Sequence, residues 1–341
     1  MKVIRTETHR QHFPKGELFG GELVRPFECP ERWDYVMDRL KTQGYEDYAE
    51  PEAVDMGLIQ RVHSPDFVEF LETAWSEWAA EGFHGDALPT VIPARRMQQR
   101  VPHHIDAKLG YYCMAIETAI TSGTWAAVKD SAACAVTAQK QVARDGQAFA
   151  LCRPPGHHAG KDLYGGYCFL NNAAIAVQSF IDDGARRVAL LDVDFHHGNG
   201  SQDIFYDRED VLFLSLHGRP EDAFPNFLGY ADENGTGKGE GFNVNYPMAP
   251  GTPYSVWGAA LDDACEKIKA YAPDALVVSL GVDTFENDPI SFFKLKSDDF
   301  KTYGDRIGQL RLPTLFVMEG GYAVSEIGIN TVNVLYAFKG A

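Results

Sequence analysis

The sequence predicts an α/β fold in which a central, mostly parallel β-sheet is flanked by helices. From about residue 148 onward, short apolar runs rich in β-branched residues alternate with amphipathic segments. This alternation is typical of a parallel sheet covered by helices on both faces. No linker rich in Pro, Gly or Ser and no internal repeat divides the 341 residues, and single α/β domains reach this length. We therefore expect a single domain over residues 1–341.

The individual elements follow from local patterns. Apolar runs predict strands at 148–152, 187–193, 211–216, 275–280 and 313–318. Helical spacing, followed by Gly or Pro as a stop signal, predicts helices at 172–183, 255–271 and 297–310. The segment from about 79 to 105 shows no periodicity, and so long an irregular stretch is usually functional or disordered.

Polar residues collect directly after the predicted strands. The ligands of open parallel sheets bind beyond the carboxyl ends of the strands, so we expect five loops to converge on one rim. In chain order their sequences are RPPGHH, DVDFHHGNG, SLHG, GVDTFEND and MEGGY.

Composition narrows the classes of partner. The formal net charge of −17 argues against a nucleic-acid partner, because phosphate recognition needs a basic surface. Such acidity is consistent with simple solubility and with attraction of a cationic substrate. The six cysteines include no C-x-x-C pair, and neither a signal peptide nor an apolar run long enough for a bilayer is present. These features predict a cytoplasmic protein that does not associate with membranes.

A metal site is predicted at the rim. Asp192, Asp194 and His196 would point the same way if strand geometry persists through them. An isolated pattern of this kind is more often a helix cap beside a hydrogen-bonded histidine. Here, however, Asp283 follows the apolar run ALVVSLGV, where an unpaired carboxylate is hard to explain. Two carboxylates and one imidazole nearly neutralise a divalent ion and leave a coordination position open, as in catalytic sites.

A general base is expected beside this site. Anionic ligands weaken the ability of a metal ion to acidify water, so the protein must supply a base. The adjacent pair His157 and His158 is the candidate, because imidazole titrates near neutral pH. Histidine pairs also occur at 103–104 and 196–197, so the pairing alone is weak evidence.

The motifs RPPGHHAG, GGYCFLNN, LDVDFHHGNG, SLGVDTFENDP and MEGGY together resemble the histone-deacetylase-like amidohydrolases of the arginase/deacetylase superfamily. The N-terminal GELFGGELVRPFE and the 79–105 insertion look most like bacterial acetylpolyamine amidohydrolases. The resemblance implies the arginase/deacetylase fold and a Zn²⁺ ion bound by Asp194, His196 and Asp283. Fe²⁺ or Co²⁺ could substitute, because mixed oxygen and nitrogen ligands discriminate weakly among these ions.

The same resemblance assigns catalytic roles. It implies that His157 pairs with Asp192, and that His158 pairs with Asn199, where many protein deacetylases carry an aspartate. A neighbouring carboxylate stabilises a protonated imidazole, whereas a neutral amide does not. We therefore expect His157 to be the cationic member and His158 to transfer the proton. The hydroxyl of Tyr322 would stabilise the oxyanion.

The resemblance also implies the surroundings of the substrate. The carbonyl of Gly166 would accept the substrate amide N–H, between aromatic walls formed by Tyr167 and Phe224. Asp106 and Glu117 match acids that engage distal ammonium groups in that family. Their spacing of eleven residues equally fits one solvated helix face.

Two further features are implied by the family. A structural K⁺ ion would bind near the catalytic metal through Asp192, Ser215 and the carbonyl of Leu216. The 79–105 insertion would build a homodimer interface that narrows the active-site entrance.

We therefore expect zinc-dependent hydrolysis of acetylated polyamines, which are small cationic substrates, to acetate and the free amine. One alternative is a lysine deacetylase acting on acetyl-lysine in proteins or peptides. Another is a catalytically silent metal-binding sensor or scaffold, although such a protein would have no need of the predicted proton-transfer residues.

Overall fold

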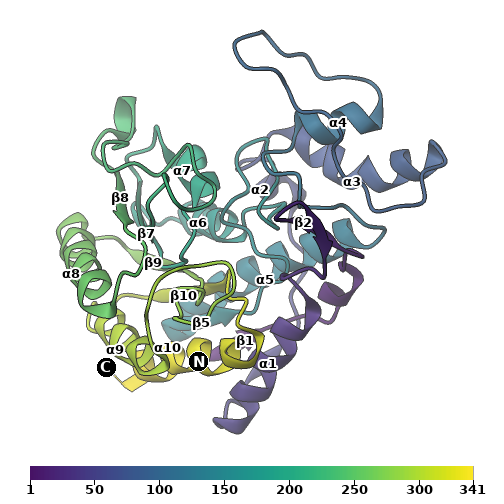
Figure 1. Ribbon diagram of the computed structural model, residues 1–341. Helices are drawn as coiled ribbons and strands as arrows, with labels where there is room; N and C mark the ends of the chain where they lie inside the picture. Colours follow the sequence, from purple (N-terminus) through teal and green to yellow (C-terminus); the bar gives the residue numbers. More distant parts are fainter. Residues whose placement is uncertain (341) are drawn as a thin grey trace.

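The computed structural model describes residues 1–340, and in these residues a single parallel sheet forms the centre of the molecule (Figure 1). Every pair of neighbouring strands in this sheet is parallel, which confirms the predicted α/β class. In spatial order the eight strands are β4 (Tyr48–Ala49), β1 (Lys2–Ile4), β5 (Gln147–Ala150), β10 (Thr314–Met318), β9 (Ala275–Leu280), β6 (Val188–Asp192), β7 (Val211–Gly218) and β8 (Asn243–Met248).

Helices cover both faces of the sheet. Alternate residues of a strand point to opposite faces, and in β9 Val277 joins one apolar cluster while Leu276 and Val278 join the other. Helices α3 (Pro65–Ala80), α5 (Thr124–Asp145) and α6 (Asn172–Asp182) contribute to the first cluster. The second cluster is completed by α1 (Pro30–Thr42), α8 (Tyr254–Tyr271), α9 (Ser297–Gly308) and α10 (Val324–Gly340).

The smaller elements lie along the edges of this three-layer body. They are the hairpin β2 (Glu17–Phe19) and β3 (Glu22–Val24), the short helices α2 (Met56–Ile59), α4 (Ile105–Tyr111) and α7 (Asn199–Phe205), and the 3₁₀ turns η1 (Thr8–Gln11) and η2 (Gly237–Gly239). No helix among residues 1–340 combines the length and the apolar character needed to cross a bilayer.

All five predicted strands and all three predicted helices are present, with ends that differ by at most two residues. The sequence did not predict β1, β4 and β8, which lie at or near the two edges of the sheet. Strands β1 and β4 are only three and two residues long. Strand β8 carries Asn243, Asn245 and Pro247, which dilute its apolar signal.

The irregular segment lies between α3 and α4. Residues 81–104 contain one isolated β-bridge, from Ala87 to Ile120, and otherwise form loop that projects above α4, away from the sheet (Figure 1). One expectation about this region is wrong: Asp106 and Glu117 do not share a helix face. Helix α4 ends at Tyr111, so Glu117 belongs to the loop that leads to α5.

Candidate active site

Three side chains that could hold a metal ion converge beyond the carboxyl ends of β6 and β9. Their ligand atoms lie within 4.8 Å of one another, and no more than 6% of any of the three residues is exposed. The Nδ1 atom of His196 is 3.2 Å from Asp194 Oδ1 and 3.0 Å from Asp283 Oδ2. The structure thus brings together the three residues that the sequence assigned to the metal.

The electrostatics of this cluster suit a bound cation. Burial and the charge of Asp194 raise the pKa of Asp283 to about 8. Burial opposes protonation of His196, but its hydrogen bonds to Asp194 and Asp283 prevail and raise its pKa to about 10. Buried carboxylates this close need a compensating positive charge. One imidazole nitrogen and carboxylate oxygens form a donor set that fits a divalent transition metal ion.

Main-chain groups and glycines hold the two carboxylates in place. The N–H of Gly320 donates to Asp194 Oδ2 at 2.8 Å, and the N–H of Phe195 donates to Asp283 Oδ1 at 2.7 Å. A Cβ atom at Gly281 would lie only 1.9 Å from Asp194 Oδ2, and one at Gly320 would lie 2.5 Å from the same oxygen. Glycine is therefore required at both positions by the close approach of the carboxylates.

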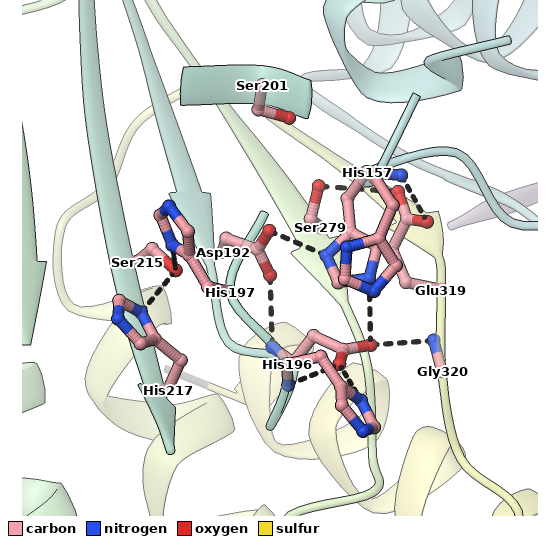
Figure 2. A network of polar contacts seen from close by, with 12 residues as sticks. His157, Asp192, His196, His197, Ser201, Ser215, His217, Ser279, Glu319 and Gly320 are labelled. Carbon is pink, nitrogen blue, oxygen red and sulfur yellow. Dashed lines mark hydrogen bonds and ion pairs between the residues drawn. The ribbon is translucent and has the colours of Figure 1, made fainter. Parts of the chain in front are cut away.

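The two candidate proton-transfer histidines have different partners, as expected. His157 Nδ1 lies 2.9 Å from Asp192 Oδ2, and His158 Nδ1 lies 2.7 Å from Asn199 Oδ1 (the His157 pair is drawn in Figure 2). Burial opposes protonation of His157, but the charges of Asp194 and Asp192 raise its pKa to about 10. Burial, reinforced by the charge of His157, lowers the pKa of His158 well below its usual value. The two rings thus differ in their partners and in the direction in which their surroundings shift the pKa.

The ring of Tyr322 lies close to the candidate metal cluster. Its ring centroid is 6.4 Å from that of His196, and the guanidinium of Arg32 lies 4.9 Å from the Tyr322 ring. Asp288 fixes the tyrosine loop, because its Oδ2 atom accepts the N–H of Tyr322 at 2.7 Å and that of Ala323 at 3.2 Å. Arg32 and Asp288 were not predicted, since neither has a spacing that distinguishes it from ordinary polar residues.

A cavity of about 220 Å³ leads from His196 toward solvent. Four of the five residues that we expected around the substrate line it, and Asp106 does not. The carboxylate of Asp106 instead accepts a hydrogen bond from Thr90 at 2.9 Å, at the start of α4. The lining residues are Glu17, Leu18, Phe19, Glu117, Gly166, Tyr167, His196, Phe224, Ile290 and Tyr322.

Two carboxylates line this cavity, and the sequence pointed to only one of them. Glu117 Oε1 accepts the N–H of Gly166 at 3.0 Å. Glu17 Oε1 accepts the hydroxyl of Tyr167 at 3.0 Å, and burial raises the pKa of Glu17 to about 7. Glu17 lies in the β2–β3 hairpin, and a lone glutamate in a hairpin carries no sequence signal of its own.

The main chain at Gly166 approaches the histidines closely. Gly166 and Tyr167 both adopt positive φ angles, of 57° and 65°. A Cβ atom at Gly166 would lie 2.5 Å from His158 Cδ2, so a larger residue would displace the imidazole. A positive φ angle is unfavourable for a bulky residue such as Tyr167. The N–H of Tyr167 donates to the hydroxyl of Thr118 at 2.8 Å.

The K⁺ site stays a prediction. The register of β6 and β7 sets Asp192 beside Ser215, with Leu216 next along β7. The Ser215 hydroxyl lies 2.8 Å from His217 Nδ1 and 3.2 Å from His197 Nδ1 (Figure 2).

Comparison with known proteins decides the family. The model of the histone deacetylase domain matches residues 26–338. The chain belongs to the histone deacetylase domain family. Acetylpolyamine amidohydrolase of Mycoplana ramosa is 53% identical over 341 residues, which is 100% of both chains. Acetylpolyamine amidohydrolase 1 of Pseudomonas aeruginosa is 54% identical over 344 residues, covering 100% of this chain and 99% of the relative.

Comparison with solved structures agrees with the assignment of this chain to the histone deacetylase domain family. The crystal structure of acetylpolyamine aminohydrolase from Burkholderia pseudomallei superposes with a TM-score of 0.93 at 38% identity, covering 99% of this chain and 98% of that one. The protein is thus a hydrolase that acts on amides, in a metal-dependent family, and Asp194, His196 and Asp283 form a cluster that could hold the metal ion.

Proposed function

We propose that the protein hydrolyses acetylated polyamines to acetate and the free amine, with zinc as its catalytic ion. The observation that carries this proposal is the pairing of the metal cluster with a narrow cavity lined by two carboxylates, Glu17 and Glu117. A cationic amine chain would find its counter-charges there, whereas the apolar Leu18 and Phe19 at the mouth would contact methylene groups. The names of the full-length relatives support the same substrate class.

Asp194, His196 and Asp283 would hold the ion. When bound, the ion supplies Lewis-acid activation of water and of the amide carbonyl. The protein orients the substrate: the Gly166 carbonyl accepts the amide N–H, and the rings of Tyr167 and Phe224 enclose the linear chain.

Proton transfer is divided between the two histidines. His158 is the neutral ring, and its Nδ1 atom is engaged by Asn199, so Nε2 is the atom that takes a proton from the attacking water. The same nitrogen then returns the proton to the leaving amine. His157 stays cationic beside Asp192 and favours the negative charge that develops on the amide oxygen.

Tyr322 completes the machinery by donating its hydroxyl to the amide oxygen as that oxygen becomes negative. Burial raises the pKa of this hydroxyl, so it keeps its proton at neutral pH. Asp288 and Arg32 hold the tyrosine loop and ring in place for this contact.

We further propose that the insertion forms a homodimer interface that narrows the entrance. Its large apolar side chains are exposed in the single chain, and patches of this kind mark interaction sites. Asp106 lies at the base of the insertion, and its substrate role would depend on this assembly. The exposed residues are Val91, Ile92, Met97 and Val101.

A substrate panel on metal-quantified protein tests the proposal. Acetylputrescine, acetylcadaverine and acetylspermine should be turned over with a higher kcat/KM than an acetyl-lysine peptide of equal acyl group. Equal or better turnover of the peptide would favour a lysine deacetylase instead. Protein that carries metal yet cleaves none of these amides would favour a catalytically silent metal-binding protein.

A further inference from the structure

Glu319 is a fully buried carboxylate for which the mechanism above has no role. It follows directly after β10 and precedes the tyrosine loop. Its Oε2 atom accepts the N–H of Gly156 at 2.7 Å and the N–H of His157 at 3.2 Å. Ser279 Oγ lies 3.4 Å from Oε1 (Figure 2). One side chain therefore binds the main chain of the histidine-bearing loop at two consecutive residues.

The setting of Glu319 indicates more than a role in filling the core. Among the described residues, no lysine or arginine forms an ion pair with the Glu319 carboxylate. The buried arginines Arg32 and Arg153 pair with Glu28 instead. Burial raises the pKa of Glu319 to about 7, although the charge of His157 and the hydrogen bond from Gly156 oppose the rise. Burying a carboxyl group costs free energy unless it is hydrogen-bonded, and here two of its partners are main-chain N–H groups of the histidine-bearing loop.

The main chain of Glu319 connects the same loop to the rest of the site. Its carbonyl accepts a hydrogen bond from Arg32 Nη2 at 2.5 Å. The next N–H, that of Gly320, donates to Asp194 Oδ2 at 2.8 Å. Glu319 and the N–H of the next residue thus connect the histidine loop, Arg32 and the carboxylate of Asp194.

We propose that Glu319 is a positioning residue whose carboxylate oxygen fixes the main chain of Gly156 and His157, and so holds the His157 ring against Asp192. The proposal rests on the proposed function, because it assigns His157 a part in the reaction. A shift of about 1 Å in a catalytic group can lower turnover by about 10²-fold, so the two hydrogen bonds should affect kcat.

Two conservative variants separate geometry from charge. Glu319→Gln keeps the reach and an acceptor oxygen but removes the charge, whereas Glu319→Asp keeps the charge but withdraws the oxygen from both N–H groups. We expect Glu319→Gln to stay within about threefold of the wild-type kcat, and Glu319→Asp to lose between about tenfold and 10²-fold. The KM of a fluorogenic acetyl-amide and the bound metal per chain should change little in both.

The matched control is Glu72→Asp, the same substitution at an exposed position of α3. Hydrogen exchange of the peptide that contains Gly156 and His157 provides a readout that does not depend on activity. These amides should exchange faster than in the wild type in Glu319→Asp, and at an unchanged rate in Glu319→Gln and Glu72→Asp.

A double-mutant cycle with His157→Ala tests whether Glu319 acts through that ring. In the His157→Ala background, Glu319→Asp should lower kcat by less than about twofold, because the ring that Glu319 positions is absent. If Glu319→Asp lowered kcat by the same factor in this background as in the wild type, the proposal would be contradicted. A Gln variant as impaired as Asp, or an Asp variant that keeps the wild-type kcat, would contradict it too. An inactive wild-type protein would instead overturn the proposed function.

Discussion

At the residue scale, the metal cluster could be found in the sequence because its members occupy diagnostic positions. Asp194 and His196 alternate beyond the end of a strand, and Asp283 follows an uninterrupted apolar run. The structure brings all three within 4.8 Å. Glu17, Asp288 and Glu319 could not be found in the same way, since each gains its role from a contact with a segment more than 30 residues away.

Tyr322→Phe tests the assignment of the oxyanion donor. The change removes one hydroxyl while the ring keeps its place beside His196 and Arg32. We expect kcat to fall by about 10²- to 10³-fold, with unchanged metal content and melting temperature. Steady-state kinetics on acetylputrescine would measure the loss. Turnover within about threefold of the wild type would exclude Tyr322 from this role.

Glu17 predicts how substrate affinity depends on pH. Burial raises the pKa of this carboxyl group to about 7, so it is neutral below that pH and anionic above it. The KM of a cationic acetylpolyamine should therefore fall as the pH rises through 7, while that of an uncharged acetyl-amide should not. In Glu17→Gln this difference between the two substrates should vanish. If the two substrates still differed in the pH dependence of their KM in this variant, another titrating group would be responsible.

The raised pKa of Glu17 also makes the free energy of unfolding depend on pH. The folded state holds this proton more tightly than the unfolded chain, whose glutamate titrates near 4.5. The contribution of Glu17 to the free energy of unfolding is thus fully present below about pH 4.5 and declines as the pH rises toward 7. Glu17→Gln should flatten this part of the stability profile relative to the wild type.

At the element scale, the inner strands and the long helices were predictable because their periodicity is strong over several residues. Strands β5, β6, β7, β9 and β10 carry the site and are apolar almost throughout. The short strands β1 and β4 form through parallel pairing with neighbours that are distant in the chain, and a local sequence pattern carries no sign of such pairing. For the same reason the spacing of Asp106 and Glu117 left a shared helix face open as an alternative, although α4 ends at Tyr111.

Helix α4 and the insertion are in close contact at Gly110. A Cβ atom there would lie 1.6 Å from the carbonyl oxygen of Val91. Gly110→Ala should therefore displace the insertion, destabilise the protein by about 1–3 kcal/mol, and speed tryptic cleavage after Arg95 and Arg96, which are exposed in the wild type and would lie on a looser segment. Gly85→Ala is the matched control, because no atom lies within 4 Å of a Cβ atom at that position. Equal cleavage rates in both variants would contradict this packing.

At the scale of the whole molecule, the net charge of −17 should assist a cationic substrate. We expect kcat/KM for acetylspermine to fall by about tenfold as ionic strength rises from about 0.01 M to about 1 M, where screening lengths shrink from about 30 Å to about 3 Å. The kcat/KM of an uncharged acetyl-amide serves as the control and should stay nearly constant. An identical salt response for both substrates would show that the acidic surface serves solubility alone.

The central claim is that one ion, held by Asp194, His196 and Asp283, is required for amide hydrolysis. The most direct measurement is a titration of metal-free protein with Zn²⁺, in which bound metal and acetylputrescine hydrolysis are followed together. We predict that activity rises in proportion to bound metal and saturates at about one catalytic ion per chain, and that Asp283→Ala abolishes both. Full hydrolysis by the metal-free protein, or by the Asp283→Ala variant, would contradict the account.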